Sequence, residues 1–307
     1  MKTAFIFPGQ GSQYVGMGKD FYENYPVAKE VFETASRVTG MDIEKLCFEP
    51  NDDINITEFT QIAMLTTSVA MFKVLEEQGL KADVYAGLSL GEYGALVASG
   101  AISMEDAFKV VRERGKYMQE AYPVGGGMTA VIGLTGEVVK ECCDKVTDGV
   151  VSVANYNCPG QIVITGEVEA VNKAADLCKE AGARRCIPLK VSGPFHSALL
   201  AGAGEKLGAV LESVELKDIE TPYLTNVTGD YVQSKDQIKD FCQKQVSSSV
   251  MWQSSVERMI ADGVTTFVEI GPGKTLTGFL KKINAEAVGI NVEKVEDVQK
   301  VVEALQA

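Results

Sequence analysis

Histidine is almost absent from this sequence, because His196 is the only one among 307 residues. Any chemistry at neutral pH that needs an imidazole therefore depends on this one side chain. Paired cysteine motifs are also missing: none of the seven cysteines forms a CxxC pair, and only Cys142 and Cys143 are adjacent. An odd number of cysteines with this spacing fits neither a disulfide framework nor a zinc site. We therefore expect reduced, packed thiols and no bound metal.

Long apolar runs and an excess of positive charge are missing as well. No run approaches the roughly 20 apolar residues that a membrane-spanning helix needs, and the apolar part of the amino-terminal MKTAFIFPGQG is too short for a signal peptide. We expect a cytoplasmic protein without a membrane partner. The formal net charge is −13. Because nucleic-acid binding depends on cations that neutralise phosphates, this charge argues against a nucleic-acid partner.

The composition that is present is that of an ordinary soluble protein, with 46% hydrophobic and 23% charged residues. A buried strand is predicted from Thr3 to Phe7, followed by a glycine-rich loop and then by a helical pattern to about Leu46. The segment TEFTQIAMLTTSVAMFKVLEEQG predicts a strongly amphipathic helix that ends at Gly79. Further strands are predicted near TPYLTNVTG and TTFVEIG, with a last helix into Lys282. This alternation predicts a parallel sheet covered on both faces.

A different order of elements is predicted in the middle of the chain. Strands at MTAVIGL, GVVSVANYN, QIVITGE and RRCIPLKV and helices at GEVVKECCDKV and VEAVNKAADLCKEAG follow the order βαββαβ, which is the ferredoxin-like arrangement. We therefore predict an α/β protein with two subdomains. Residues 1–127 and 192–307 form the large subdomain with the parallel sheet, and residues 128–191 form an inserted small subdomain.

The segment VYAGLSLGEYGAL places Ser89 between two glycines, after a predicted strand and before a predicted helix. GxSxG in this setting is typical of a nucleophile elbow, where small neighbours allow a sharp turn that exposes the serine hydroxyl. The bare pattern is a weak motif in a chain with 30 glycines. A serine that only fills a tight turn is the alternative, and the pattern alone leaves both interpretations open.

A nucleophilic serine needs a base to take its proton, and His196 is the only histidine that could do so. The segment VSGPFHSALL places His196 after a predicted strand and a Gly-Pro turn, at the edge where open α/β sheets bind ligands. A lone histidine is more often structural. Its position after the elbow serine, as in α/β-hydrolases, favours a functional role.

These residues, together with FPGQGSQ, VRERGKYMQ, QIVITG and VEIGPGKTLTG, closely resemble the malonyl-CoA:acyl carrier protein transacylase family of bacterial fatty acid synthesis. The similarity runs from Phe5 to about Lys282, with the motifs in the family's order. It implies a hydrolase-like large subdomain beside a ferredoxin-like small one. It also implies ping-pong transfer of malonyl from malonyl-CoA to the phosphopantetheine thiol of acyl carrier protein, through a malonyl-serine intermediate, for fatty acid elongation. No cofactor is implied, and we expect a monomer.

The resemblance assigns catalytic roles to five positions. Ser89 resembles the family's nucleophile and His196 its general base and acid. Gln245, in FCQKQVSSSVMW, resembles the residue whose backbone carbonyl orients the histidine, so its side chain is expected to matter less than its main chain. The backbone N–H groups of Gln10 and Leu90 are implied to form the oxyanion hole, where such donors contribute about 3 kcal/mol each.

Arg114, in RERGKYMQ, is the residue implied to choose the substrate. Its planar fork would hold the free carboxylate of malonate through two parallel hydrogen bonds. An acetyl group would leave the guanidinium desolvated and unpaired. The alternative for Arg114 is an ordinary surface charge on a helix. Met118, Gln61 and Phe195 are implied to complete the pocket, and Phe195 tends to accompany malonyl rather than methylmalonyl selection in relatives.

The sequence departs from the family pattern at three places. Leu88 stands where the family usually has a histidine before the serine, and we expect altered packing rather than lost activity. The family's NPV is SSV at residues 248–250, which leaves the path of the loop carrying Gln245 less certain. Ile62 replaces a proline that often follows the glutamine of the TQP motif.

Three other functions stay open at this stage. A serine esterase or thioesterase would share Ser89 and His196 but would not need Arg114, and would usually orient the histidine with an acidic side chain. A non-catalytic carrier-binding scaffold and a trans-acting polyketide acyltransferase are the other two.

Docking of the carrier is expected to use local cations, because acyl carrier proteins are typically acidic and so is this chain. A solvated charge run is the alternative explanation for each candidate. The candidates are Arg184, Arg185, Lys190, Lys281 and Lys282.

Overall fold

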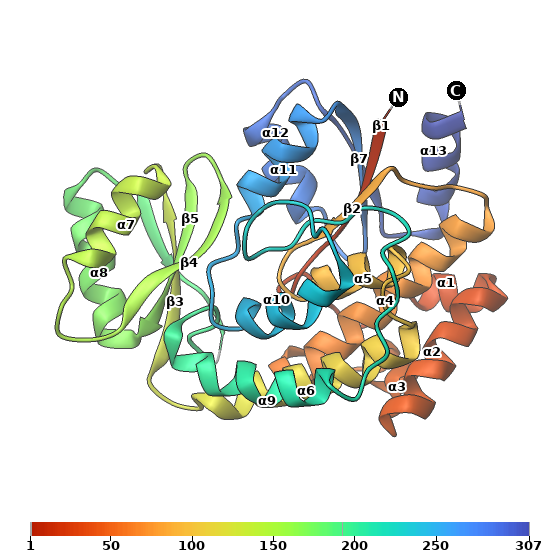
Figure 1. The fold of residues 1–307 in the computed structure, drawn as a ribbon, viewed down its shortest axis with the longest axis horizontal. Coiled ribbons are helices and arrows are strands. Elements are labelled where there is room, and N and C mark those ends of the chain that lie inside the picture. Colours follow the sequence, from red (N-terminus) through yellow and green to blue (C-terminus); the bar gives the residue numbers. More distant parts are fainter. Residues whose placement is uncertain (1, 192, 307) are drawn as a thin grey trace.

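The computed structural model describes residues 2–191 and 193–306 and contains two separate sheets (Figure 1). The first sheet is parallel and has the strand order β2-β1-β7-β8. Its strands are β1 (Lys2–Phe7), β2 (Val84–Gly87), β7 (Val264–Ile270) and β8 (Val288–Val292). The second sheet is antiparallel and has the order β4-β5-β3-β6. Its strands are β3 (Gly126–Ile132), β4 (Val151–Cys158), β5 (Gln161–Glu167) and β6 (Arg185–Pro188).

The predicted α/β fold with two subdomains is confirmed. The second sheet and its helices, α7 (Gly136–Asp144) and α8 (Val168–Glu180), follow the order β3-α7-β4-β5-α8-β6, which is the ferredoxin-like arrangement. This unit forms one end of the molecule, beside the larger part that contains the parallel sheet (Figure 1). Residue 192, at the second predicted boundary, lies outside the described residues, and the subdomain limits stay a prediction.

The central strand β1 is buried along almost its whole length because helices cover both faces of the parallel sheet. Its side chains alternate between two hydrophobic clusters, as the twofold repeat of a strand requires. Phe5 and Phe7 belong to the larger cluster on one face. Ala4 and Ile6 belong to a second cluster on the other face, which includes Trp252. The site described below lies at the end of this strand.

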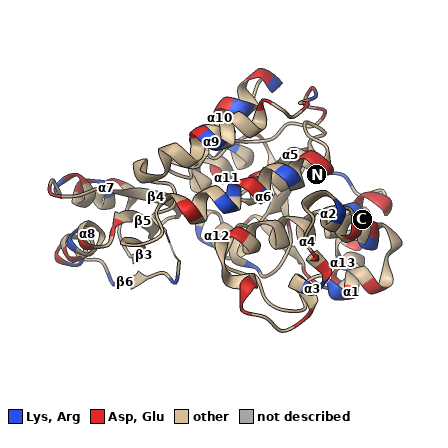
Figure 2. Cartoon of the chain, turned by 90° about the horizontal axis from the view of Figure 1, so that it is seen from below, with Lys and Arg blue, Asp and Glu red and all other residues tan. Residues whose placement is uncertain are grey.

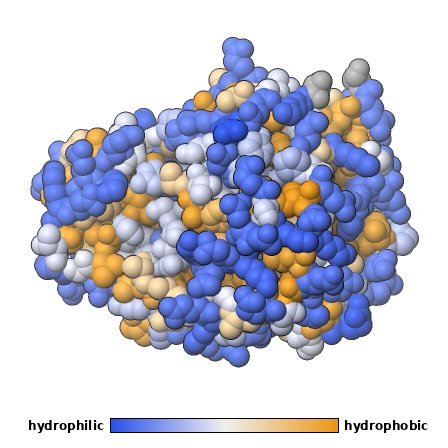
Figure 3. Space-filling view, in the orientation of Figure 1, coloured by the Kyte–Doolittle hydropathy of each residue, from blue (hydrophilic) through white to orange (hydrophobic). Residues whose placement is uncertain are grey.

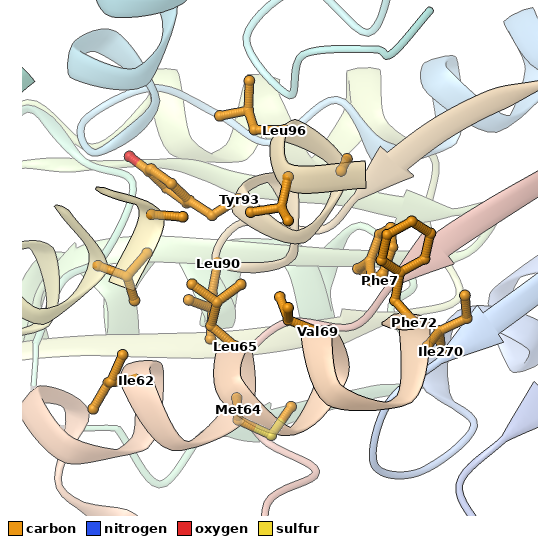
Figure 4. Packing of buried hydrophobic residues seen from close by; sticks show 14 of the residues in the cluster. Phe7, Ile62, Met64, Leu65, Val69, Phe72, Leu90, Tyr93, Leu96 and Ile270 are labelled. Carbon is orange, nitrogen blue, oxygen red and sulfur yellow. The ribbon is translucent and has the colours of Figure 1, made fainter. Parts of the chain in front are cut away.

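The helix predicted after residue 56 is present as α4 (Thr57–Glu77), but the predicted amphipathic pattern is wrong. The helix is buried on almost every side, because it packs against helices α2 (Pro26–Thr39), α5 (Gly91–Ala98) and α6 (Met104–Ala121). Its threonines remain satisfied within the core, since the hydroxyls of Thr66 and Thr67 donate to backbone carbonyls one turn earlier at 2.8 and 2.9 Å. Figure 4 shows Leu65 and Val69 of α4 pointing toward the segment that carries Leu90 and Tyr93, where α5 begins. This buried helix supports the elbow from below.

The remaining helices surround the two sheets. The pattern predicted as one helical stretch to about Leu46 folds as three helices, since Pro26 begins the second of them. These three are α1 (Lys19–Asn24), α2 (Pro26–Thr39) and α3 (Ile43–Phe48). The others are α5 (Gly91–Ala98), α6 (Met104–Ala121), α9 (Ala201–Leu211), α10 (Ile238–Gln245), α11 (Trp252–Ala261), α12 (Thr275–Ile283) and α13 (Val295–Gln306).

The strand predicted near TPYLTNVTG is not a strand in the structure, apart from single bridges at Tyr223 and Leu224. Tyr223 pairs with Tyr85 beside β2, and Leu224 N donates to the Tyr85 carbonyl at 3.1 Å. The chain then turns at residues 226–228, and Asn226 binds the elbow as described below. Strand β8 and helix α13, at the carboxyl end, were not predicted.

The loop at residues 248–250 is hydrogen-bonded to β4 of the antiparallel sheet, so its path is well defined despite the unusual sequence SSV. Val250 N donates to the Ala154 carbonyl of β4 at 2.7 Å, and Tyr156 N donates to the Val250 carbonyl at 3.0 Å. The Ser249 hydroxyl donates to the Val153 carbonyl at 2.6 Å. The ferredoxin-like unit is therefore hydrogen-bonded to the loop that follows α10.

Candidate active site

Ser89 lies in a sharp turn between β2 and α5 and has a backbone φ of 53°, in the left-handed region that disfavours residues with a Cβ. Its backbone N–H donates to Asn226 Oδ1 at 2.6 Å, which holds this conformation. Glycine is required on both sides of the serine because other backbone atoms lie close to the Cα atoms of Gly87 and Gly91. A Cβ on Gly87 would lie 1.9 Å from the Gly91 carbonyl oxygen, and a Cβ on Gly91 would lie 2.1 Å from the Phe7 carbonyl oxygen. The segment therefore has the geometry of a nucleophile elbow.

His196 meets the elbow serine directly, with its Nε2 atom 2.8 Å from Ser89 Oγ. Its Nδ1 atom lies 2.8 Å from the backbone carbonyl oxygen of Gln245. A carbonyl only accepts, so Nδ1 carries the proton and the free Nε2 accepts from the Ser89 hydroxyl. His196 also has a left-handed φ, of 58°. Both partners are thus held in strained backbone conformations that aim their side chains at each other.

The protonation state of His196 suits a base. Burial, followed by the nearby charge of Arg114, lowers the pKa of His196 to about 4. The imidazole is therefore neutral at pH 7, with Nε2 free to accept a proton from Ser89.

Arg114 of α6 is 1% exposed, so its interpretation as a surface charge is wrong. Its Nη1 donates to Gln61 Oε1 at 2.7 Å, while its Nη2 donates to Gln245 Oε1 at 3.0 Å and to Ser89 Oγ at 3.2 Å. The guanidinium lies over the ring of Tyr93, 5.6 Å from its centroid. Among the described residues, no acidic side chain forms an ion pair with it. A buried cation of this kind is free to pair with an anionic ligand.

A cavity of about 770 Å³ opens beside Ser89 and His196, between the two subdomains. Its lining includes all but two of the predicted site residues; Arg114 and Gln245 lie behind its wall, where Arg114 donates to the lining residue Gln61. In the wall, Gln61 Nε2 donates to the sulfur of Met118 at 3.4 Å. The predicted residues that line it are Ser89, His196, Gln10, Leu90, Gln61, Met118 and Phe195.

Two residues of the site were missed from the sequence, namely Glu92 and Asn226. Glu92 Oε2 accepts from Gln245 Nε2 at 2.6 Å and from the Asn226 backbone N–H at 3.0 Å. Asn226 also donates to the Gly87 carbonyl at 2.7 Å. The side chain of Gln245, expected to matter less than its main chain, thus lies at the centre of the network. Glu92 stands in the elbow motif itself, but a charged residue in a helix pattern predicts exposure rather than burial.

The outer helices of the molecule carry charges of both signs (Figure 2). Figure 2 shows acidic and basic residues interspersed on the outer helices, and Figure 3 shows apolar areas scattered among polar ones. Of the docking candidates, only Lys190 lines the cavity. Lys282 donates to Gln161 Oε1 at 3.1 Å, between the subdomains. Leu88 also lines the cavity, at the position where the family usually has histidine.

Within the described part of the chain, no helix is both long and apolar enough to span a bilayer.

Comparison with known families decides which group of proteins shares this arrangement. The family described as acyl transferase domain matches residues 4–302. The chain belongs to the acyl transferase domain family. This acyl transferase is 46% identical to the malonyl CoA-acyl carrier protein transacylase of Bacillus subtilis, over 99% of this chain and 98% of the relative. The resemblance found in the sequence is thereby confirmed.

Solved structures agree with this assignment. A malonyl CoA-acyl carrier protein transacylase from Clostridium perfringens superposes on this acyl transferase with a TM-score of 0.96 and 46% identity, covering 100% of this chain and 98% of that one. A second structure holds a malonyl-transacylase in complex with a type II PKS acyl-carrier protein. It has a TM-score of 0.96 and 41% identity and covers 99% of this chain and 100% of that one.

Proposed function

We propose that this acyl transferase moves malonyl from malonyl-CoA to the phosphopantetheine thiol of acyl carrier protein and so supplies fatty acid elongation. The names of the full-length relatives support this substrate pair. The main support for the proposal is that His196 and Arg114 both contact Ser89 Oγ. His196 Nε2 lies 2.8 Å from this oxygen and Arg114 Nη2 lies 3.2 Å from it. A base and a buried cation thus meet at one hydroxyl, beside a cavity large enough for an acyl thioester.

In the first half-reaction, His196 takes the proton of Ser89 as the serine oxygen attacks the thioester carbonyl of malonyl-CoA. The tetrahedral intermediate collapses as the C–S bond breaks. The imidazolium then gives its proton to the departing coenzyme A thiolate, which leaves malonyl esterified to Ser89. The Gln245 carbonyl holds the imidazole in the required tautomer throughout, because Nδ1–H stays bound to it.

In the second half-reaction, the carrier thiol replaces coenzyme A. His196 takes the thiol proton as the sulfur attacks the serine ester, and it returns that proton to the Ser89 oxygen when the C–O bond breaks. The negative oxygen formed in both steps is assigned to the backbone N–H groups of Gln10 and Leu90, whose residues line the cavity beside Ser89. No metal or cofactor takes part in this scheme.

Substrate selection is assigned to Arg114. The free carboxylate of malonate would take over donors that now bind the side-chain oxygens of Gln61 and Gln245. Met118 and Phe195 bound the space beside them and limit the size of the acyl group. An acetyl group offers no carboxylate, so the guanidinium keeps only these neutral partners and malonyl is preferred.

The esterase and thioesterase alternative is not favoured. Such enzymes usually orient the histidine with a carboxylate, whereas here Nδ1 of His196 faces a backbone carbonyl. The scaffold alternative is not favoured either, because Ser89, His196 and Arg114 are assembled for chemistry. A carrier of polyketide synthesis would use the same site, but we assign the enzyme to fatty acid elongation and expect it to act as a monomer.

Intact-mass spectrometry after mixing the protein with malonyl-CoA tests the proposal. We expect one malonyl adduct on Ser89 that persists until holo acyl carrier protein is added and then moves to the carrier. The Ser89→Ala variant is the control and should form no adduct. Rapid release of free malonate in the absence of the carrier would contradict the proposal and indicate a hydrolase.

A further inference from the structure

Glu92 is a fully buried glutamate that the proposed mechanism does not use. It lies in the first turn of α5, three residues after Ser89, and has 0% exposure. It does not line the cavity, so it cannot touch the acyl group of a bound substrate. A buried carboxylate costs free energy unless its partners compensate for lost hydration. Its retention here needs an explanation.

The partners of Glu92 are residues that hold the site together. Both bonds fall on Oε2, which accepts from Gln245 Nε2 at 2.6 Å and from the Asn226 N–H at 3.0 Å. Its Oε1 has no partner among the described residues. Gln245 Nε2 also donates to the Ser89 carbonyl at 3.0 Å. The carboxylate thus binds Gln245, the residue that orients His196, and the Gln245 amide in turn binds the backbone of the elbow.

The Gln245 amide fits between Glu92 and Arg114 in only one orientation. A guanidinium offers only donors, and an ionised carboxylate offers only acceptors. The amide therefore turns its oxygen to Arg114 and its NH₂ to Glu92. Rotating the amide by half a turn would set donor against donor and acceptor against acceptor. The glutamate thereby fixes the amide, and the amide fixes the guanidinium that contacts Ser89.

We propose that ionised Glu92 is a positioning residue for malonyl transfer, acting through the Gln245 side chain to hold Arg114 in place against Ser89. The inference rests on the proposed function and adds a residue to it. Protonation of Glu92 replaces a charge-assisted hydrogen bond to Gln245 by a neutral one of about half the strength. The amide is then less firmly oriented, and malonyl loses more than acetyl does because only malonyl uses Arg114.

The titration of Glu92 falls in a useful range. Burial raises the pKa of Glu92 to about 7, although its hydrogen bonds and the charge of Arg114 act in the opposite direction. Burial also raises the pKa values of the neighbouring thiol and phenols, which therefore stay neutral near pH 7. The titratable groups that face Glu92 are Arg114 from α6, Cys242 from α10, Tyr93 from α5 and Tyr223 beside β2.

The test measures the rate of Ser89 acylation by malonyl-CoA and by acetyl-CoA between pH 5.5 and 8.5, without the carrier. Single-turnover acylation avoids titration of the carrier thiol. For the wild type we expect the malonyl rate to rise through about pH 7. For Glu92→Gln we expect a pH-independent malonyl rate about tenfold below the wild type at pH 8, with a smaller loss for acetyl.

Glu269→Gln is the matched control, because Glu269 is a second buried glutamate outside this network. Its carboxylate accepts from the backbone N–H groups of Leu276 and Thr277 at the start of α12. We expect this variant to keep the rise through pH 7. Glu92→Asp retains a carboxylate and should keep pH dependence at a lower rate, and it serves as the second variant if Glu92→Gln does not fold.

The outcomes separate the two proposals. If the wild type forms no malonyl adduct, the proposed function fails. If the wild type is acylated but Glu92→Gln keeps its rate and pH profile, the role of Glu92 is refuted. A lower melting temperature with equal losses for malonyl and acetyl at every pH would show that Glu92 is only structural, and so would an Asp variant without pH dependence.

Discussion

Replacing Arg114 by methionine tests how the site distinguishes malonyl from acetyl. The guanidinium is 1% exposed, and three of its hydrogen bonds end on Gln61, Gln245 and Ser89. Methionine keeps most of the volume and removes the charge and every donor. Acetyl has no group for Arg114 to bind, so the loss should fall on malonyl.

The size of the loss follows from the exchange of partners. In the free enzyme the fork binds two neutral amide oxygens, at 2.7 and 3.0 Å. Bound malonate would replace them by a carboxylate that pairs with the planar fork through two parallel bonds, and a hydrogen bond to a charged group contributes about 1.5–3 kcal/mol. Two such bonds give a net preference of about 3 kcal/mol for malonyl. Arg114→Met should therefore lower the malonyl-to-acetyl ratio of kcat/KM on the order of a hundredfold.

The assay is competitive acylation of Ser89 by equimolar malonyl-CoA and acetyl-CoA, with the two adducts resolved by mass. Arg112→Met is the control, because Arg112 lies on the same helix, pairs with Glu58 at 2.8 Å and sits over Phe59 outside the cavity. This control should keep the wild-type ratio. If Arg114→Met also keeps a strong malonyl preference, the carboxylate is read by another group and the reasoning is wrong.

Three further predictions concern folding and pH. Gly87→Ala should abolish acylation, because its Cβ would lie 1.9 Å from the Gly91 carbonyl oxygen, and a wild-type burst of coenzyme A release would contradict this. The pKa of His196 is lowered to about 4, so the unfolded chain binds more protons below pH 6.5 and this histidine reduces stability as pH falls. In urea unfolding, the free energy of unfolding of His196→Gln relative to the wild type should therefore increase by about 2 kcal/mol from pH 7.5 to pH 5. An equal difference between the two proteins at both pH values would contradict this prediction. Ser103→Ala should lower the free energy of unfolding by about 1 kcal/mol in the same assay, because the Ser103 hydroxyl accepts from Asp106 N at 3.1 Å and caps α6. An unchanged urea midpoint would show that this cap does not stabilise the protein.

Features that depend on short stretches of chain could be predicted from the sequence. The elbow at Ser89 follows from two glycines between a strand and a helix, and the βαββαβ unit follows from hydrophobic periodicity. The positions of His196 and Arg114 came from motifs of the family, and their contacts with Ser89 are seen only in the structure.

Features that depend on packing between distant segments could not be predicted. Helix α4 contains threonines and a glutamine that suggest a polar face, but neighbouring helices enclose it and its hydroxyls bind its own backbone. Glu92 looks like a surface residue because its partners, Asn226 and Gln245, are more than 130 positions away in the sequence. A single sequence carries no signal for such pairings, because propensity and periodicity describe only local structure.

The acceptor that orients His196 belongs to the main chain of residue 245, and every amino acid has that carbonyl. Scanning mutagenesis at this position can remove the amide that contacts Arg114 but leaves the orienting oxygen in place. A point mutation at residue 245 therefore leaves the hydrogen-bond acceptor of His196 Nδ1–H in place. Only a displacement of the backbone at this residue removes that acceptor. Deletions or insertions between α10 and the 248–250 loop would shift this carbonyl and so remove the hydrogen bond that orients His196.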